Sequence, residues 1–256
     1  MFHGWLLTSA GLVLLFIFGP LAKTILAPSW DIFLEALRDK EVLGSVWLSL
    51  YTSGLAALIC LVFGTPLAFL LARRRFRGKK VVESLIDLPI MIPHPVVGIA
   101  LLTIAGRNNA LGKLLLSIGV SLMGSVTGIV TVLVFVGMPF FVNTVKAGME
   151  SVSPRLENVS RSLGAGPGAT FVRITLPLSW RYLLVGMIMC MARAISEFGA
   201  IVIVAYHPMI APVLMYERFT AYGLPYSQPV AVLLILVSMF FFLFLRVVSQ
   251  PKETAR

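Results

Sequence analysis

The composition of this 256-residue chain is that of a membrane protein. Hydrophobic residues make up 58% of it and charged residues 12%, whereas soluble domains are about half apolar and about one quarter charged. This composition argues against a soluble globular fold. Basic residues outnumber acidic ones by 21 to 11, which in a soluble protein would suggest nucleic acid. In a membrane protein this excess first marks the loops that face the cytoplasm, so no nucleic-acid partner is predicted.

Six apolar runs are long enough to be transmembrane helices. A bilayer core of about 30 Å needs about 20 apolar residues in a helix. The runs cover residues 5–26, 46–71, 85–104, 126–145, 180–205 and 230–248. No Lys or Arg precedes the first run and no small-residue cleavage site follows it, so we expect a span and not a signal peptide. The sequence predicts an all-α, polytopic helical bundle that forms a single transmembrane domain over residues 1–256.

A short segment between the first two runs predicts an amphipathic helix. Its apolar residues recur at i, i+3, i+4 and i+7, namely Trp30, Phe33, Leu34 and Leu37. This spacing is typical of a helix with one apolar face. The segment is too short and too charged to cross a membrane, so we expect it to lie on the outer surface.

The distribution of basic residues predicts the orientation of the chain. Lys and Arg concentrate after the second run (residues 73–80), after the fourth run (146–181) and in the tail. The alternate loops hold fewer of them, diluted by acidic residues. By the positive-inside rule the three basic segments are cytoplasmic. We expect a multi-pass plasma-membrane protein, surrounded by lipid, with both termini in the cytoplasm; a specific RNA or lipid site on the arginine cluster is a less economical interpretation.

The polar loop between the fourth and fifth runs carries the signals of a short helix. Ser153 and Pro154 suit the N-cap and the first helical position, and Gly164 suits the C-terminal cap. Between them lies an apolar stripe at i, i+3 and i+7, formed by Leu156, Val159 and Leu163. A second helix start follows at Pro167. A capped helix of this kind suits docking in a groove of a soluble partner, and the alternative is a helix lying on the membrane surface.

This loop resembles the signature loop of ABC importer permeases, whose pattern is Glu-Ala-Ala, three residues, Gly, nine residues, then Ile-x-Leu-Pro. Residues 158–164 and 174–177 keep that spacing in full. Asn158, Val159 and Ser160 replace the Glu-Ala-Ala triplet, and Glu157 places a carboxylate one position earlier. The resemblance implies that residues 153–177 form a cytoplasmic coupling loop that docks on an ATP-binding subunit. The coupling residues implied are Leu156, Glu157, Asn158, Val159, Leu163, Gly164 and Pro167.

No nucleotide or metal site is predicted in the chain itself. The glycine-rich stretch 164–170 lacks the Lys-Ser/Thr ending of a phosphate-binding loop, and no strand is predicted before it. Cys60 and Cys190 lie inside apolar runs, without a CxxC motif or clustered His, and are interpreted as packing residues. We therefore expect a transport subunit that is not an enzyme and binds no cofactor or metal. ATP and Mg would be held by the partner subunit.

Ionisable residues inside two of the runs are candidates for the translocation pathway. Arg193 and Glu197 stand at i, i+4 in the fifth run, and such groups usually face a bundle interior or a wet path. His94 lies among three prolines in the third run, which predicts a broken helix lining a cavity. Two interpretations stay open. One is a pathway lined by His94, Arg193, Ser196 and Glu197; the other is a structural ion pair, with a histidine that satisfies freed backbone carbonyls.

Two longer stretches, residues 87–102 and 192–219, resemble the permease subunit of archaeal-type molybdate/tungstate importers. The resemblance implies the type I ABC importer permease fold, working as a homodimer with two ATP-binding subunits and an external oxyanion-binding protein. It also implies import of molybdate or tungstate by ATP-driven alternating access. The first alternative is a sulfate/thiosulfate importer permease. A second, from another class, is an intramembrane enzyme or ion channel that uses Arg193, Glu197 and His94.

Overall fold

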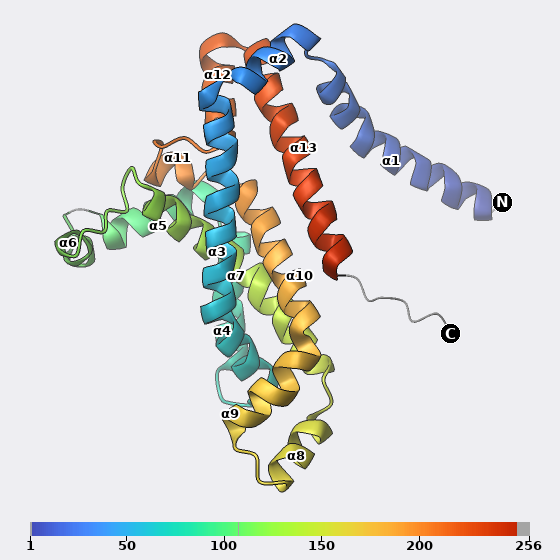
Figure 1. The fold of residues 1–256 in the computed structure, drawn as a ribbon, viewed down its shortest axis with the longest axis vertical. Helices are drawn as coiled ribbons and strands as arrows, with labels where there is room; N and C mark the ends of the chain where they lie inside the picture. Colours follow the sequence, from blue (N-terminus) through green and yellow to red (C-terminus); the bar gives the residue numbers. More distant parts are fainter. Residues whose placement is uncertain (1, 107, 250–256) are drawn as a thin grey trace.

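The structure is a computed structural model that describes residues 2–106 and 108–249, and over these residues it is built from helices without strands. The basic tail used in the orientation argument, residues 250–256, lies outside this part. The elements are α1 (Phe2–Leu26), α2 (Trp30–Arg38), α3 (Lys40–Arg73), α4 (Lys79–Met91), α5 (His94–Ala105), α6 (Ala110–Ser117), α7 (Val126–Ser151), α8 (Pro154–Ser162), α9 (Pro167–Thr170), the π-helix η1 (Phe171–Thr175), α10 (Leu176–Ile195), α11 (Ile201–Val204), α12 (Ala211–Tyr222) and α13 (Leu224–Ser249). Figure 1 shows the long helices of an elongated bundle.

Five helical segments are long and apolar enough to cross a membrane, and α4 with α5 forms a sixth, broken one. The five lie in α1, α3, α7, α13 and the helix Pro167–Ile195, which joins α9, η1 and α10. α4 and α5 meet at a bend of 115°. Pro93 and Pro95 explain it, because proline has no N–H to donate and disfavours a helical residue before it. The expected all-α bundle and the expected break in the third apolar run are confirmed.

The fifth span differs from the predicted run 180–205 at both ends. It begins at Pro167, inside the polar loop, and it ends at Ile195, five residues before α11. Hydropathy did not reveal this end, because the residues beyond the break are again apolar. The carboxylate of Glu197 accepts a hydrogen bond from the backbone N–H of Ala200. A continuing helix would give that N–H to a backbone carbonyl, so the side chain replaces the helical bond.

The core of the bundle lies where α3, α7 and α10 pack together. Two glycines of α7 allow the close approach. A Cβ atom on Gly137 would lie 2.5 Å from the Cys190 sulfur, and one on Gly148 would lie 2.1 Å from Cγ of Tyr182. Cys60 and Cys190 are buried free thiols whose sulfurs lie 3.6 Å apart, so both pack in this core.

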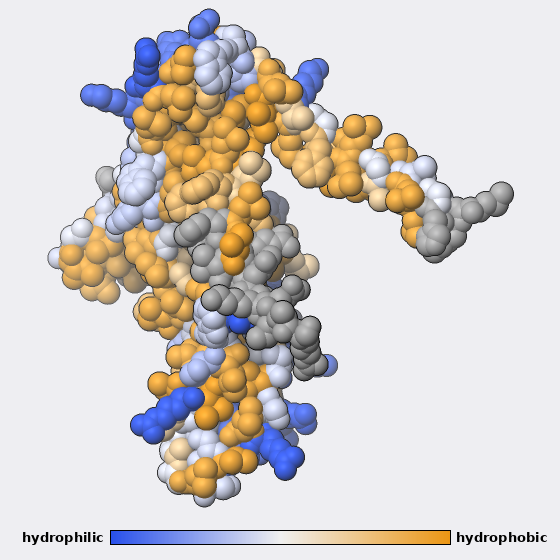
Figure 2. Space-filling model, turned by 45° about the vertical axis from the view of Figure 1, so that its right-hand side comes forward, coloured by the Kyte–Doolittle hydropathy of each residue, from blue (hydrophilic) through white to orange (hydrophobic). Residues whose placement is uncertain are grey.

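The surface of the molecule has the character expected of a membrane protein. Figure 2 shows a broad hydrophobic band between two ends that carry the most hydrophilic side chains. α1 diverges from the bundle in Figure 1, and no residue of its membrane-length segment is buried. Most apolar side chains of residues 4–26 are therefore exposed.

The predicted amphipathic helix is confirmed as α2, and an ion pair fixes the corner that follows it. Asp39 accepts a hydrogen bond from the backbone N–H of Glu41, 2.8 Å away, and so caps α3. Its carboxylate also lies 2.6 Å from the guanidinium of Arg218 on α12. Partial burial raises the pKa of Asp39, but the hydrogen bonds from Arg218 and Glu41 outweigh that effect and hold the pKa below its usual value. The corner is thus tied to α12 by charge.

Candidate functional site

One continuous helix, Pro167–Ile195, connects the two regions that the sequence singled out. We call it the lever helix. At about 1.5 Å per residue its 29 residues span about 43 Å. Its first end belongs to the loop 153–177. Its last turn holds Arg193, and Glu197 lies two residues beyond its end. One helical element therefore links the loop to the ion pair.

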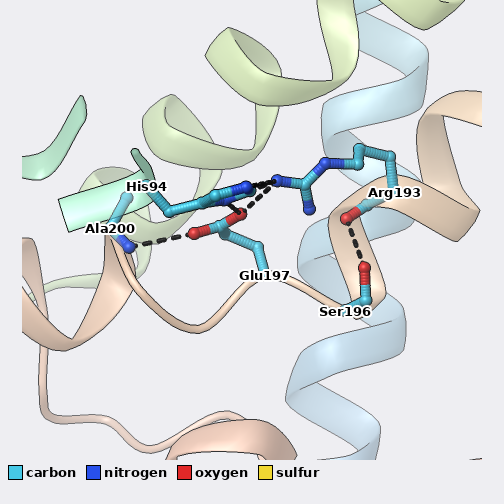
Figure 3. Close-up of polar contacts among 5 residues, drawn as sticks. All are labelled: His94, Arg193, Ser196, Glu197 and Ala200. Carbon is cyan, nitrogen blue, oxygen red and sulfur yellow. Dashed lines mark hydrogen bonds and ion pairs between the residues drawn. The ribbon is translucent and has the colours of Figure 1, made fainter. Parts of the chain in front are cut away.

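Three ionisable side chains meet at the last end of the lever helix. We call His94, Arg193 and Glu197 the ion cluster (Figure 3). Glu197 Oε2 lies 2.7 Å from Nη2 of Arg193 and 2.6 Å from Nδ1 of His94. Its other oxygen accepts from the backbone N–H of Ala200 at 2.9 Å. The Glu197 side chain is 0% exposed, and these three donors satisfy a charge that would otherwise be costly to bury.

The tautomer of His94 follows from its partners. Glu197 as a carboxylate only accepts, so the contact at Nδ1 requires the ring proton on that nitrogen. Nε2 is then the acceptor, and Nη2 of Arg193 lies 3.0 Å from it. The same Nη2 is also 2.6 Å from Nδ1, a contact that cannot be a hydrogen bond once Nδ1 carries the proton. A neutral imidazole therefore fits between the arginine and the glutamate.

The ion cluster joins two breaks in membrane-spanning helices. His94 is the first residue of α5, directly after the bend, and Glu197 lies in the break between α10 and α11. Two glycines let the breaks touch. A Cβ atom on Gly199 would lie 2.9 Å from Cβ of His94, and one on Gly98 would lie 2.8 Å from the backbone oxygen of Ala200. Figure 1 shows α5 and α11 between the two ends of the molecule.

The ion cluster is buried at Glu197 and exposed at His94. The side chain of His94 is 43% exposed and that of Arg193 is 17% exposed. Ser196 is also exposed, but its hydroxyl donates to the backbone oxygen of Arg193 and does not bind the ion cluster. Three of the four predicted pathway residues are thus brought into contact, and Ser196 lies beside them.

The loop at the other end of the lever helix has the predicted local structure. The hydroxyl of Ser153 accepts from the backbone N–H of Arg155 at 3.4 Å, α8 begins at Pro154, and Gly164 has a φ of +89°. A left-handed residue of this kind ends helices and favours glycine. Six of the seven predicted coupling residues are exposed, namely Leu156, Asn158, Val159, Leu163, Gly164 and Pro167. The apolar stripe of α8 therefore faces outward.

Glu157 lies on the opposite side of α8 from the exposed stripe. It is 4% exposed, and its Oε1 accepts from Nε of Arg73 at 2.8 Å and from the hydroxyl of Thr175 at 2.7 Å. Sequence reasoning placed Glu157 in the coupling helix but missed both partners. Their contacts join residues far apart along the chain, so no local spacing reveals them. The only hint was that Arg73 begins the basic segment after the second run.

Within the described residues no group of three His, Cys, Asp or Glu side chains could hold a metal ion. The glycine-rich stretch 164–170 forms a turn and the start of α9. The ionisable groups that do cluster are paired with each other. The arrangement places an exposed short helix at one end of the lever helix and a polar junction between broken helices at the other.

Comparisons with known proteins agree with this architecture. The family described as binding-protein-dependent transport system inner membrane component matches residues 64–252. The molybdate/tungstate transport system permease protein WtpB of Pyrococcus furiosus is 43% identical over 231 residues, which cover 89% of this chain and 87% of that protein. The sulfate transport system permease protein CysT of Synechocystis sp. is 31% identical over 199 residues, which cover 76% and 70% respectively.

Solved structures give the fold. The crystal structure of a bacterial ABC transporter involved in the import of the acidic polysaccharide alginate contains a chain with a TM-score of 0.74 and 19% identity. The match covers 99% of this chain and 96% of the other. At this identity the similarity shows the fold alone, which is that of type I ABC importer permeases.

Proposed function

The chain belongs to the family of binding-protein-dependent transport system inner membrane components, and from this premise we propose that it is the permease subunit of an ABC importer for molybdate and tungstate. The observation that carries the substrate class is the 43% identity, over 89% of the chain, to a permease named for these anions. The sulfate permease is more distant at 31% over 76%. This difference favours molybdate and tungstate over the sulfate alternative.

The coupling helix α8 gives the proposed mechanism its starting point. Leu156, Val159 and Leu163 expose 48%, 51% and 83% of their surfaces, and such a stripe fits a groove in an ATP-binding subunit. ATP, with Mg, binds to that partner, and its closure moves α8. The lever helix carries the movement to the ion cluster and switches the spans between inward-facing and outward-facing states. Hydrolysis resets the cycle.

The open side of the ion cluster is the proposed wall of the translocation pathway. His94 and Ser196 are exposed between the two hydrophilic ends of the molecule, and a polar face of this kind is costly to leave in hydrocarbon. We expect water and a second copy of the chain, not lipid, to cover it, with the pathway at the twofold interface. Because Glu197 already neutralises Arg193, a passing dianion would be held weakly, as a conducting path requires.

The remaining partners and the orientation follow from the same scheme. The basic segments near α8 favour placing the coupling loop and both termini in the cytoplasm. The assembly is then two copies of this chain, two ATP-binding subunits and an external oxyanion-binding protein that selects and delivers the anion. The opposite end, with α2 and α12, would receive that protein.

The test is ATP hydrolysis by the chain reconstituted in proteoliposomes with its cognate ATP-binding subunit. The external binding protein is added empty, or loaded with molybdate, tungstate or sulfate. We expect stimulation by the molybdate- or tungstate-loaded protein, with import of the same anion. Stimulation by the sulfate-loaded protein alone would replace the substrate class. Absence of a complex and of any stimulation would overturn the proposed function.

A further inference from the structure

We propose that Arg73 and Thr175 are positioning residues for energy coupling, which act through Glu157 to hold the docking helix α8 at a fixed angle to α3 and to the lever helix. This inference rests on the proposed function. It gives Glu157 a role inside the permease, as the internal anchor of the coupling loop. The residues that meet the ATP-binding subunit are then a different set from those that transmit its movement.

The first observation is that α8 has no apolar anchor. Among its nine residues, Pro154–Ser162, the buried one is Glu157. Its apolar side chains Leu156 and Val159 are half exposed and face away from the bundle. Hydrophobic contact is non-directional and would fix the helix only loosely. The position of α8 therefore depends on charge-assisted hydrogen bonds, which are short and directional.

The second observation is the number of elements that meet at this carboxylate. Arg73, the last residue of α3, gives Nε to Glu157 at 2.8 Å and Nη2 to the backbone oxygen of Val152 at 2.8 Å. Val152 directly follows α7. One guanidinium thus ties the end of α3 to the end of α7 and to α8. It is 12% exposed at its side chain, so water competes weakly for these bonds.

The third observation places the lever helix in the same network. Thr175 is the last residue of η1, is fully buried, and donates its hydroxyl to Glu157 at 2.7 Å. η1 itself packs on α3 through Phe69 and Phe171, whose ring centroids lie 4.7 Å apart. π-Helical turns inside α-helices recur at functional sites. A push on α8 reaches α3 and the lever helix together because Glu157 binds to both.

The experiment compares four variants in the full complex: Arg73→Gln, Glu157→Gln, Thr175→Val and the exchange Arg73→Glu with Glu157→Arg. Each is reconstituted with the ATP-binding subunit and the binding protein loaded with the anion that stimulates the wild type. The quantity measured is the number of ATP molecules hydrolysed per anion imported. A residue with a purely structural role would lower both activities together and leave this ratio unchanged.

We expect the ratio to rise about tenfold in Arg73→Gln and Glu157→Gln, as the loss of one charge-assisted bond predicts. Thr175→Val, which removes only a neutral hydroxyl, should raise it about two- to threefold. The exchange variant should recover part of the coupling, because it restores the pair with reversed charge.

Two results would overturn the inference. The first is a wild-type ratio in all three single substitutions. The second is an altered ratio in the exchange variant as large as in the single ones, together with normal coupling in Thr175→Val. If Arg73→Gln fails to assemble, the ratios of Thr175→Val and of the exchange variant still decide for or against the inference. Failure of the proposed function is distinct, because the wild-type complex would then show no anion-stimulated hydrolysis at all.

Discussion

Both ends of the lever helix hold a buried glutamate beside an arginine, but the two pairs are built differently. Glu197 follows the end of the lever helix and pairs with Arg193, four residues earlier in the last turn of that helix; it reaches another span through His94. Glu157 takes its arginine from α3, and reaches the lever helix through Thr175. The first pair neutralises its charge locally. The second has no local partner, so its charge is neutralised only while α3 and α8 keep the relative position that brings Arg73 to Glu157.

Because of this difference, we expect the first pair to affect the stability of the fold and the second to affect how the movement of α8 is transmitted. A buried carboxylate that loses its only strong partner is left as an uncompensated charge, which typically costs about 3–5 kcal/mol. At the ion cluster that cost falls on the folding of the spans. At the coupling loop it falls on the angle of one short surface helix. Substitutions at either end of the lever helix test this contrast.

The largest effect is expected for Arg193→Met. The variant keeps an unbranched apolar stem but removes the guanidinium, and so leaves the fully buried Glu197 with His94 and one backbone N–H. We expect a loss of about 3–5 kcal/mol in stability, seen as a lower melting temperature of the purified complex in nanodiscs. Adding Glu197→Gln to the same chain should recover part of that loss, because no charge is then left uncompensated. A wild-type melting temperature in the single variant would contradict this account.

Leu163→Asp should abolish coupling without harming the fold. Leu163 is 83% exposed, so the monomer loses nothing, but a charge enters the proposed docking stripe. Losing the burial of one leucine costs about 2 kcal/mol, or more than tenfold in affinity. We expect anion import and stimulated ATP hydrolysis to fall by at least that factor. Ser84→Asp adds the same charge at an exposed position of α4 and is the control; normal coupling in Leu163→Asp would sink the docking interpretation.

Glu197→Gln probes the pathway more gently than Arg193→Met. The amide keeps the shape of the carboxylate but no longer neutralises Arg193, so a dianion in the pathway should be released more slowly. We expect import to fall about tenfold, equivalent to about 1.4 kcal/mol on the barrier, while assembly of the dimer is retained. Glu157→Gln makes the same chemical change in the coupling loop and serves as the comparison. Its expected defect is a higher number of ATP molecules hydrolysed per anion imported. Loss of the folded dimer without a selective transport defect would make Glu197 a structural residue.

The smallest effect is expected at the outer corner, where the ion pair is more exposed. Arg218→Met removes the partner of Asp39, whose side chain is 31% exposed, so the loss should stay below about 1 kcal/mol. The pKa of Asp39 is held below its usual 3.8 in the folded protein. The pair therefore stabilises the fold above that pH and loses its contribution as the pH falls through the depressed value. The difference in melting temperature between variant and wild type should be full at pH 7 and should shrink as the pH is lowered below 3.8; a constant difference would refute this linkage.

Features that depend on neighbours along the chain could be predicted from the sequence. Ser153, Pro154 and Gly164 delimit α8 as expected, and the prolines after Met91 break the third span. The end of the fifth span could not be predicted from hydropathy, because it depends on one side chain, Glu197, replacing a backbone acceptor. Its other partner, His94, lies 103 residues away. Pairings of this kind are set by how the helices cross, which no local pattern contains.

The two faces of α8 also have different freedom to change. Side chains on the outward stripe are half exposed or more, so they can vary with the shape of whichever ATP-binding subunit is present. Glu157, Arg73 and Thr175 form one hydrogen-bonded unit, so a change in any of them requires a compensating change in another. A permease built this way can adapt to a different ATP-binding subunit by changes in the outward stripe, while the hydrogen bonds among Glu157, Arg73 and Thr175 are kept.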